Sequence, residues 1–261
     1  MKSSARVSSG SDVTVRAPPA AKPLDAIDAK PASPDGKAFV TAALKDIAAR
    51  TARGEKVRVV FDIDDTLADT RARTLAIAKA WDAANGTSYF GRLTLAQVAH
   101  TGLDTARALN LPWPAEKAFV DHWSVAFWDG ASFAHDLPIP ETIALAKAAK
   151  AAGAELVYLT GRWDDREHHT IDQLRRFGLE AGPDNVVSKP GPSTLTVPFK
   201  AGWLEQSRLD GFHCAFFITE SRRDIAGIQA AGEPAVSVLL DHPFGGPENV
   251  RPETPVYPRA I

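Results

Sequence analysis

The chain has 261 residues, of which 44% are hydrophobic and 24% are charged, and its formal net charge is −2. These proportions are ordinary for a globular protein that buries a core, and the charge balance gives no basic surface for nucleic acid. The single cysteine, Cys214, excludes an intramolecular disulfide framework and a cysteine-based zinc site, and it favours a reducing compartment.

The first 33 residues are rich in Ser, Pro and Ala and lack the apolar stretch of a secretory signal. We predict that residues 1–33 form a disordered segment. The longest Ala- and Leu-rich stretch, Ile143–Leu156, is interrupted by lysines and is too short to cross a bilayer. We therefore expect a cytoplasmic protein with no membrane partner and no nucleic-acid partner.

The first predicted elements are a helix from near Asp35 to Gly54 and a buried strand that begins at Val57. Two acids, Asp62 and Asp64, follow this strand. Carboxylates crowded at the end of a buried strand repel one another. They become favourable around a cation, or as a nucleophile beside an acid/base. A cluster of helix N-caps uses the same residue types, so this segment alone leaves a structural role open.

A long helical segment separates this strand from the next. Residues 71–84, 95–109 and 115–127 have helical spacing, and glycines and prolines separate them. A crossover between parallel strands needs only about a dozen residues, so we predict that residues 70–135 form a helical cap subdomain. Aromatic residues in such a segment usually build its own small core. Here they are Trp81, Phe90, Trp113, Trp123, Phe127 and Trp128.

Two arginines, Arg71 and Arg73, begin this segment beside the acidic strand end. They can bind an anionic group of a substrate through paired hydrogen bonds, or they can lie on a solvated helix face. The histidines do not suggest a metal site. Only His168 and His169 adjoin, and neighbours on a helix point about 100° apart.

Strands and helices alternate in the rest of the chain. After a loop at Asp136–Pro140, helices are predicted at 141–152, 165–177, 198–208 and 224–231, and strands at 156–159, 185–188, 215–218 and 235–240. The tail after residue 241 is expected to run over the surface. This alternation predicts an α/β fold with a Rossmann-like three-layer core, in which residues 34–69 and 136–261 form a parallel sheet of about five strands and its covering helices.

Polar residues follow three of these strands at their carboxyl ends, where open sheets of this kind bind ligands. Asp62 ends the first strand, Thr160 the second and Glu220 the fourth. A threonine hydroxyl can bind a phosphate, and Gly161 lets a backbone N–H approach the same oxygens. Arg162 follows directly and can bind an anion. A Thr-Gly turn after a strand is also common, so these residues alone leave a structural role open.

These residues occur in the order of the motifs of the haloacid dehalogenase (HAD) superfamily. Asp62-Ile63-Asp64-Asp65-Thr66-Leu67 resembles motif I, and Thr160-Gly161-Arg162 resembles motif II. The resemblance implies that Asp62 attacks phosphorus to form an aspartyl-phosphate. It implies that Asp64 protonates the leaving group and then activates water, and that Thr160 holds the phosphate. It also implies that the cap covers the site and selects the substrate.

Motif III of this family is a lysine, and two residues match its place. Lys189 lies in Ser188-Lys189-Pro190, as in some relatives, and Lys200 lies at a predicted helix start, 20 residues before Glu220. We favour Lys200, because the helix start brings its ammonium to the ligand crevice. Lys189 is then a further phosphate-binding candidate. Either lysine can instead be solvated, which is the usual place of this residue type.

Motif IV departs from the family pattern, because Thr219-Glu220 replaces the frequent Gly-Asp. Glutamate reaches about one methylene farther than aspartate and still offers Mg²⁺ a hard oxygen ligand. The resemblance implies that Mg²⁺ is bound by Asp62, by Asp64 through its backbone carbonyl, and by Glu220. Asp224 is a further acid near the metal or an anchor for its ligands, and it can also complement a helix dipole.

The sequence thus predicts a Mg²⁺-dependent phosphomonoester hydrolase that acts on a small phosphorylated metabolite. A phosphomutase is an alternative, and so is a weakened binding or regulatory protein, which Thr219-Glu220 favours. A dehalogenase is disfavoured, because cleavage of a carbon–halogen bond needs no leaving-group acid such as Asp64. A phosphatase of nucleic-acid ends lacks the basic surface. The substrate and the oligomeric state are not predicted.

Overall fold

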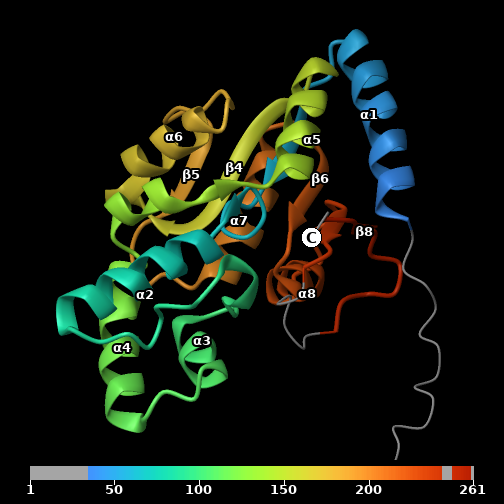
Figure 1. Cartoon of the computed structure of the whole chain (residues 1–261). Helices are drawn as coiled ribbons and strands as arrows, with labels where there is room; N and C mark the ends of the chain where they lie inside the picture. Colours follow the sequence, from blue (N-terminus) through green and yellow to red (C-terminus); the bar gives the residue numbers. More distant parts are fainter. Residues whose placement is uncertain (1–34, 243–248, 260–261) are drawn as a thin grey trace, which may run out of the picture. The chain divides into compact units, whose positions relative to one another are not determined.

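The computed structural model describes residues 35–242 and 249–259, and the predicted disordered segment 1–33 lies outside these residues. A parallel sheet of six strands, in the order β5-β4-β1-β6-β7-β8, forms the centre (Figure 1). The predicted α/β fold is confirmed, with one strand more than expected. The strands are β1 (Val57–Phe61), β4 (Glu155–Trp163), β5 (Val186–Lys189), β6 (His213–Thr219), β7 (Ser237–Leu240) and β8 (Val256–Tyr257).

β1 lies inside the sheet and explains the apolar run in the sequence. It pairs with β4 on one side and with β6 on the other, so that Phe61 is opposite Tyr158 and Ile218. Val59 and Phe61 belong to one apolar cluster, and Val60 belongs to another. Because side chains alternate between the two faces, β1 is buried on both of them, and such strands have a nearly continuous apolar sequence.

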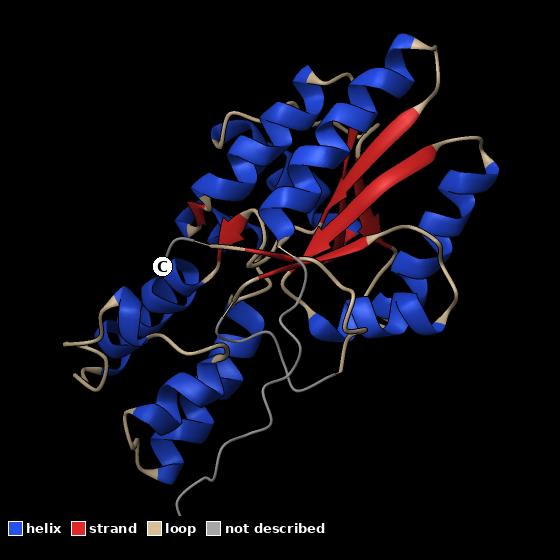
Figure 2. Cartoon of the chain, turned by 90° about the vertical axis from the view of Figure 1, so that its right-hand side faces the viewer, coloured by secondary structure: helices blue, strands red, loops and turns tan. Residues whose placement is uncertain are grey.

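Helices cover both faces of the sheet (Figure 2). The first apolar cluster includes residues of α1 (Gly36–Ala52), α5 (Pro140–Ala151) and α6 (Glu167–Arg176), which follows the 3₁₀ turn η3 (Asp164–Arg166). The second cluster includes residues of α7 (Thr196–Leu209) and α8 (Arg222–Ala230). These are the three predicted layers. Within the described residues, no helix is long and apolar enough to cross a membrane.

The helical segment of residues 70–135, called the insertion below, lies between β1 and β4 in the chain. It contains α2 (Arg71–Asn85), the 3₁₀ turn η1 (Leu95–Gln97), α3 (Gly102–Ala108), α4 (Trp113–Ala126) and the 3₁₀ helix η2 (Gly130–His135). The rings of Trp81 and Phe90 pack on Phe119, with centroids 5.7 and 4.4 Å away. Where the insertion begins and ends, β2 (Ala68–Asp69) and β3 (Leu137–Pro138) form a short antiparallel pair.

The structure corrects several predicted details. The helix predicted at 95–109 is broken, because Thr101 caps a new helix whose first residue, Gly102, lies close to Trp123. A Cβ atom at Gly102 would lie 2.5 Å from that indole ring. Trp113 does not join the core of the insertion but is 71% exposed at the start of α4. The tail contributes β8, which the sequence does not indicate because this strand has only two residues.

Candidate active site

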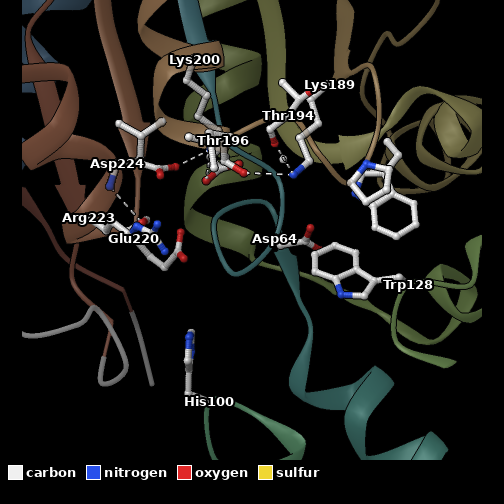
Figure 3. Close-up of a pocket in the computed structure, with 17 residues that line it drawn as sticks. Asp64, His100, Trp128, Lys189, Thr194, Thr196, Lys200, Glu220, Arg223 and Asp224 are labelled. Atoms are coloured by element: carbon white, nitrogen blue, oxygen red, sulfur yellow. Dashed lines mark hydrogen bonds and ion pairs between the residues drawn. The ribbon is translucent and has the colours of Figure 1, made fainter. Parts of the chain in front are cut away.

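A cavity of about 720 Å³ opens at the carboxyl ends of the central strands (Figure 3). Its lining includes Asp62 after β1, Gly161 in β4 and Glu220 after β6, together with Trp128 of the insertion. Sites for small ligands have volumes in this range. Three strand ends that are far apart in the sequence therefore contribute to one cavity.

Asp62 is oriented by contacts on both of its carboxylate oxygens. Its backbone N–H donates to the Ile218 carbonyl (3.0 Å), which continues the ladder between β1 and β6. Oδ1 accepts a hydrogen bond from the Ile63 N–H (2.8 Å), while Oδ2 lies 2.9 Å from the Thr219 hydroxyl and 2.8 Å from Lys200 Nζ. Burial raises the pKa of Asp62, and the Lys200 ammonium opposes that shift. The result is a fixed carboxylate at the cavity wall.

The two candidate lysines have different surroundings. Lys200, in the second turn of α7, is 1% exposed, and its Nζ lies 2.8 Å from Asp62 and 2.6 Å from Asp224. Burial alone would lower the pKa of Lys200, but the two carboxylates outweigh it and raise this pKa. Lys189 donates to the Thr194 carbonyl (3.0 Å), and burial lowers its pKa. The lysine at the helix start is therefore the one in contact with Asp62.

Asp64 is paired with two fully buried arginines. Arg162 binds it in a bidentate manner, Nε to Oδ2 at 3.0 Å and Nη2 to Oδ1 at 2.7 Å, and Arg73 Nη2 lies 2.9 Å from Oδ1. Burial would raise the pKa of Asp64, but the two guanidinium groups outweigh it and hold this pKa well below its usual range. Asp64 is therefore ionised in this structure.

The arginine pair belongs to a larger buried network. Asp136, the first residue after the insertion, accepts a hydrogen bond from Arg73 Nε (2.9 Å) and one from Gln173 Nε2 (2.6 Å). Arg162 in turn donates to Gln173 Oε1 (2.7 Å). The ring of Phe133 packs against both guanidinium groups, 4.4 Å from that of Arg73 and 4.0 Å from that of Arg162. Arg73 belongs to the insertion, so the insertion contacts Asp64, which follows β1.

Glu220 lies among other acids, and no described residue offers it a basic partner at contact distance. Its Oε2 accepts a hydrogen bond from the Thr66 hydroxyl (3.0 Å) and lies 3.2 Å from the Thr219 hydroxyl, whose single proton Asp62 also attracts. No ion pair among the described residues joins Glu220 to Lys, Arg or His. Burial, together with the charges of Asp62 and Asp65, raises the pKa of Glu220 well above its usual range. A hard cation would relieve this repulsion.

Comparisons with solved structures identify the fold. A protein from Clostridium difficile assigned as a phosphatase is 15% identical, with a TM-score of 0.56, over 79% of this chain and 95% of its own. A haloacid dehalogenase-like hydrolase from Streptococcus pneumoniae is 13% identical, with a TM-score of 0.52, over 78% and 93%. This chain has the HAD-like fold.

The same fold occurs in protein tyrosine kinase A of Mycobacterium tuberculosis, which is 19% identical, with a TM-score of 0.52, over 79% of this chain and 94% of its own. A scan against protein-family models and a search of curated proteins found no match. At these identities the likeness establishes the HAD-like fold and leaves the activity to be argued from the site.

The predicted phosphate-binding residues are only partly in the cavity. Gly161 and Lys189 line the cavity. Arg162 instead forms an ion pair with Asp64, and Arg71 forms one with Asp69 (2.7 Å). Neither arginine belongs to the lining. Arginines beside buried acids pair with them, because an unpaired buried charge is costly. At Gly161 a Cβ atom would lie 3.1 Å from Cγ2 of Thr196, so α7 starts close to this glycine.

Thr160, the other predicted motif II residue, is fully buried and does not line the cavity. Its hydroxyl oxygen accepts a hydrogen bond from the Arg162 N–H (3.2 Å). Among the described residues, sequence reasoning missed the partners Asp136 and Gln173 entirely. Neither one belongs to a motif, and only the path of the chain brings them to Arg73 and Arg162.

The four predicted metal residues have different partners. Asp64 pairs with the two arginines, whereas Asp224 and Asp62 share Lys200. Within residues 35–242 and 249–259, no group of three or more His, Cys, Asp or Glu side chains is arranged to hold a metal ion. Mg²⁺ usually keeps several waters and one or two carboxylates. Asp62 and Glu220, with the Asp64 carbonyl, fit that limited requirement.

Proposed function

We propose that the chain is a Mg²⁺-dependent phosphomonoester hydrolase that forms a phosphoryl-enzyme intermediate at Asp62. The observation that carries this proposal is the Asp62 carboxylate, fixed by Lys200 and Thr219 at the wall of the cavity. In the first step, an Asp62 oxygen attacks phosphorus in line as the bond from phosphorus to the leaving oxygen breaks. In the second step, water attacks the phosphoryl group and releases Asp62 and inorganic phosphate.

Two positive charges offset repulsion between Asp62 and the substrate phosphate. The Lys200 ammonium is already in place at 2.8 Å. Bound Mg²⁺, held by Asp62, Glu220 and the Asp64 carbonyl, would neutralise the phosphate charge. Gly161 lines the cavity, and its N–H is the proposed donor to the remaining phosphate oxygens. Buried Thr160, which accepts a hydrogen bond from the Arg162 N–H, positions this turn. The HAD-like fold supports a hydrolase, and these residues support the phosphoryl chemistry.

Asp64 is the proposed acid and base, and its arginines constrain how it acts. The leaving alkoxide needs a proton, but Arg73 and Arg162 hold Asp64 ionised. The negative charge of a substrate phosphate raises the pKa of a nearby carboxyl, and Asp64 lines the cavity that would hold this phosphate. We propose that Asp64 is protonated in the substrate complex, gives this proton to the leaving oxygen, and then takes one from the attacking water.

The direct test is release of inorganic phosphate from a panel of phosphorylated metabolites, with Mg²⁺ and with a chelator. The proposal predicts release from at least one ester only when Mg²⁺ is present. Absence of release from every ester in the presence of Mg²⁺ would contradict it. If the protein still bound phosphate in that case, the binding or regulatory alternative would be favoured.

Replacement of Glu220 by glutamine is expected to weaken Mg²⁺ binding. Because the amide lacks the negative charge, we expect the Mg²⁺ concentration for half-maximal activity to rise by about tenfold or more. Magnesium titrations of phosphate release measure this change. Glu205→Gln is the matched control, because Glu205 is an exposed acid of α7. Equal magnesium requirements in the two variants would remove Glu220 from the metal site.

The two lysines are expected to differ in which kinetic constant they affect. Lys200→Met removes the charge that contacts Asp62 and should lower kcat by about 10²- to 10³-fold. Lys189→Met removes a charge at the cavity lining and should mainly raise KM. Steady-state kinetics separate the two results, with melting curves to confirm that both variants are folded. A larger loss of kcat in Lys189→Met than in Lys200→Met would contradict this assignment and would indicate that Lys189 is the lysine that acts with Asp62.

A further inference from the structure

Two tryptophans from different parts of the chain form one wall of the cavity. Trp128 follows α4 in the insertion, and Trp163 is the last residue of β4 in the core. Their rings are nearly parallel, with centroids 6.3 Å apart and an interplanar angle of 18°. Both residues line the cavity and are half-buried, and Figure 3 shows Trp128 at the cavity. The two indoles thus contribute apolar surface to the lining of a cavity that also contains charged residues.

The tryptophan wall is held in place from outside the cavity. The guanidinium of Arg166, a residue that does not line the cavity, lies over the Trp163 ring at 4.3 Å. Arg166 Nε also donates a hydrogen bond to the Trp128 carbonyl. The Phe127 ring meets that of Trp128 edge to face at 5.1 Å. These contacts fix both indoles before a ligand binds, and such a preorganised surface costs little to order.

The cavity is much larger than a phosphoryl group. Asp62, Lys200 and Glu220 occupy the charged part, and most of the volume of about 720 Å³ remains for a leaving group. Leu195, at the start of α7, also lines the cavity and is 70% exposed. A small polyol would leave the indoles and this leucine in contact with water. A flat aromatic group would cover them.

We propose that the substrate is a phosphomonoester whose leaving group carries a flat aromatic ring, such as a nucleobase, which stacks on Trp128 and Trp163. This proposal rests on the proposed hydrolase function and adds the substrate class. Indole rings stack on any flat π-face. The polar lining residues, among them Thr194, Thr196 and Ser221, can bind a sugar that carries the base. The wall itself offers aromatic and aliphatic surface.

Two pairs of esters that each share a primary alkoxide leaving group test the proposal. Adenosine 5′-monophosphate is compared with ribose 5-phosphate, and benzyl phosphate with cyclohexylmethyl phosphate. We expect kcat/KM to be about tenfold or more higher for the aromatic member of a pair. Preference within the first pair alone indicates a nucleobase, and preference within both pairs indicates any aromatic ring.

Variants of the wall separate stacking from other causes of that preference. Trp128→Leu and Trp163→Leu should bring the kcat/KM ratio of the first pair towards one, and Trp128→Phe should retain most of it. Trp113→Leu is the control, because Trp113 is 71% exposed and does not line the cavity. A ratio near one in the wild type, or a ratio unchanged in both leucine variants of the wall, would overturn the inference.

Failure of the proposed function has a different signature. If ribose 5-phosphate is hydrolysed and the kcat/KM ratio of the first pair is near one, the hydrolase function is supported and the aromatic substrate class is rejected. Absence of release from these four esters and from every ester of the metabolite panel rejects the hydrolase. In that case calorimetric titrations of Asp62→Asn with Mg²⁺ decide the inference. Tighter binding of adenosine 5′-monophosphate than of ribose 5-phosphate supports the stacking wall, and equal or no binding overturns it.

Discussion

Asp62→Asn is expected to abolish phosphate release, lowering kcat by about 10³-fold or more while leaving the fold intact. The amide has nearly the same shape as the carboxylate and can still contact Thr219, but it is not a nucleophile. Lys200 keeps Asp224 as a partner at 2.6 Å, so the change does not leave the ammonium unpaired. Phosphate release in the presence of Mg²⁺ measures the effect.

The control for this variant is Asp46→Asn. Asp46 is a half-exposed acid of α1 that pairs with Arg50, and its replacement should leave kcat unchanged. Melting curves of both variants establish that the loss in Asp62→Asn is chemical and not a loss of folded protein. Substantial turnover by folded Asp62→Asn would contradict the nucleophile assignment.

Arg73→Met is expected to lower the free energy of unfolding by about 3–5 kcal/mol. Arg73 is fully buried and contacts Asp64 and Asp136, and the Asp136 side chain is itself fully buried. Methionine fills part of the volume but leaves Asp136 with Gln173 and a more distant Arg162, 3.5 Å away. Urea denaturation of the two proteins at neutral pH measures the difference.

Arg71→Met is the matched control for this second variant. Arg71 lies in the same helix and pairs with Asp69, but Arg259 also lies 2.7 Å from Asp69. Because Asp69 keeps a basic partner and Arg71 is partly exposed, we expect a loss of about 1 kcal/mol or less. Similar losses in the two variants would show that the buried network is not held by Arg73.

The positions of the site at the strand ends could be predicted because they follow from local sequence and simple topology. A continuous apolar run identifies a strand that is buried on both faces, and parallel strands present their carboxyl ends at one edge. These two rules are enough to place Asp62 and Glu220 at the same edge of the sheet. The preference for Lys200 over Lys189 needed one more, namely that a helix starts near that edge.

The pairing of the arginines could not be predicted, because it depends on side-chain directions across the insertion. The sequence indicates that Arg73 and Arg162 bind an anion, but the anion is the side chain of Asp64 and not a group of the substrate. Their other partner, Asp136, is 63 residues from Arg73. No spacing rule connects such positions. β8 could not be predicted for a different reason, because a strand of two residues is too short to show the alternation of apolar and polar side chains. The domain boundaries, the magnesium ion and the cytoplasmic location stay predictions.

Chemical trapping of the intermediate tests the central claim most directly. The protein is mixed with a hydrolysed ester and Mg²⁺, quenched within milliseconds, reduced with borohydride and analysed by peptide mass spectrometry. Borohydride converts an aspartyl-phosphate to homoserine, so the account predicts homoserine at position 62, only with substrate, and none in Asp62→Asn. Turnover with Asp62 unmodified, or modification at another residue, would contradict it.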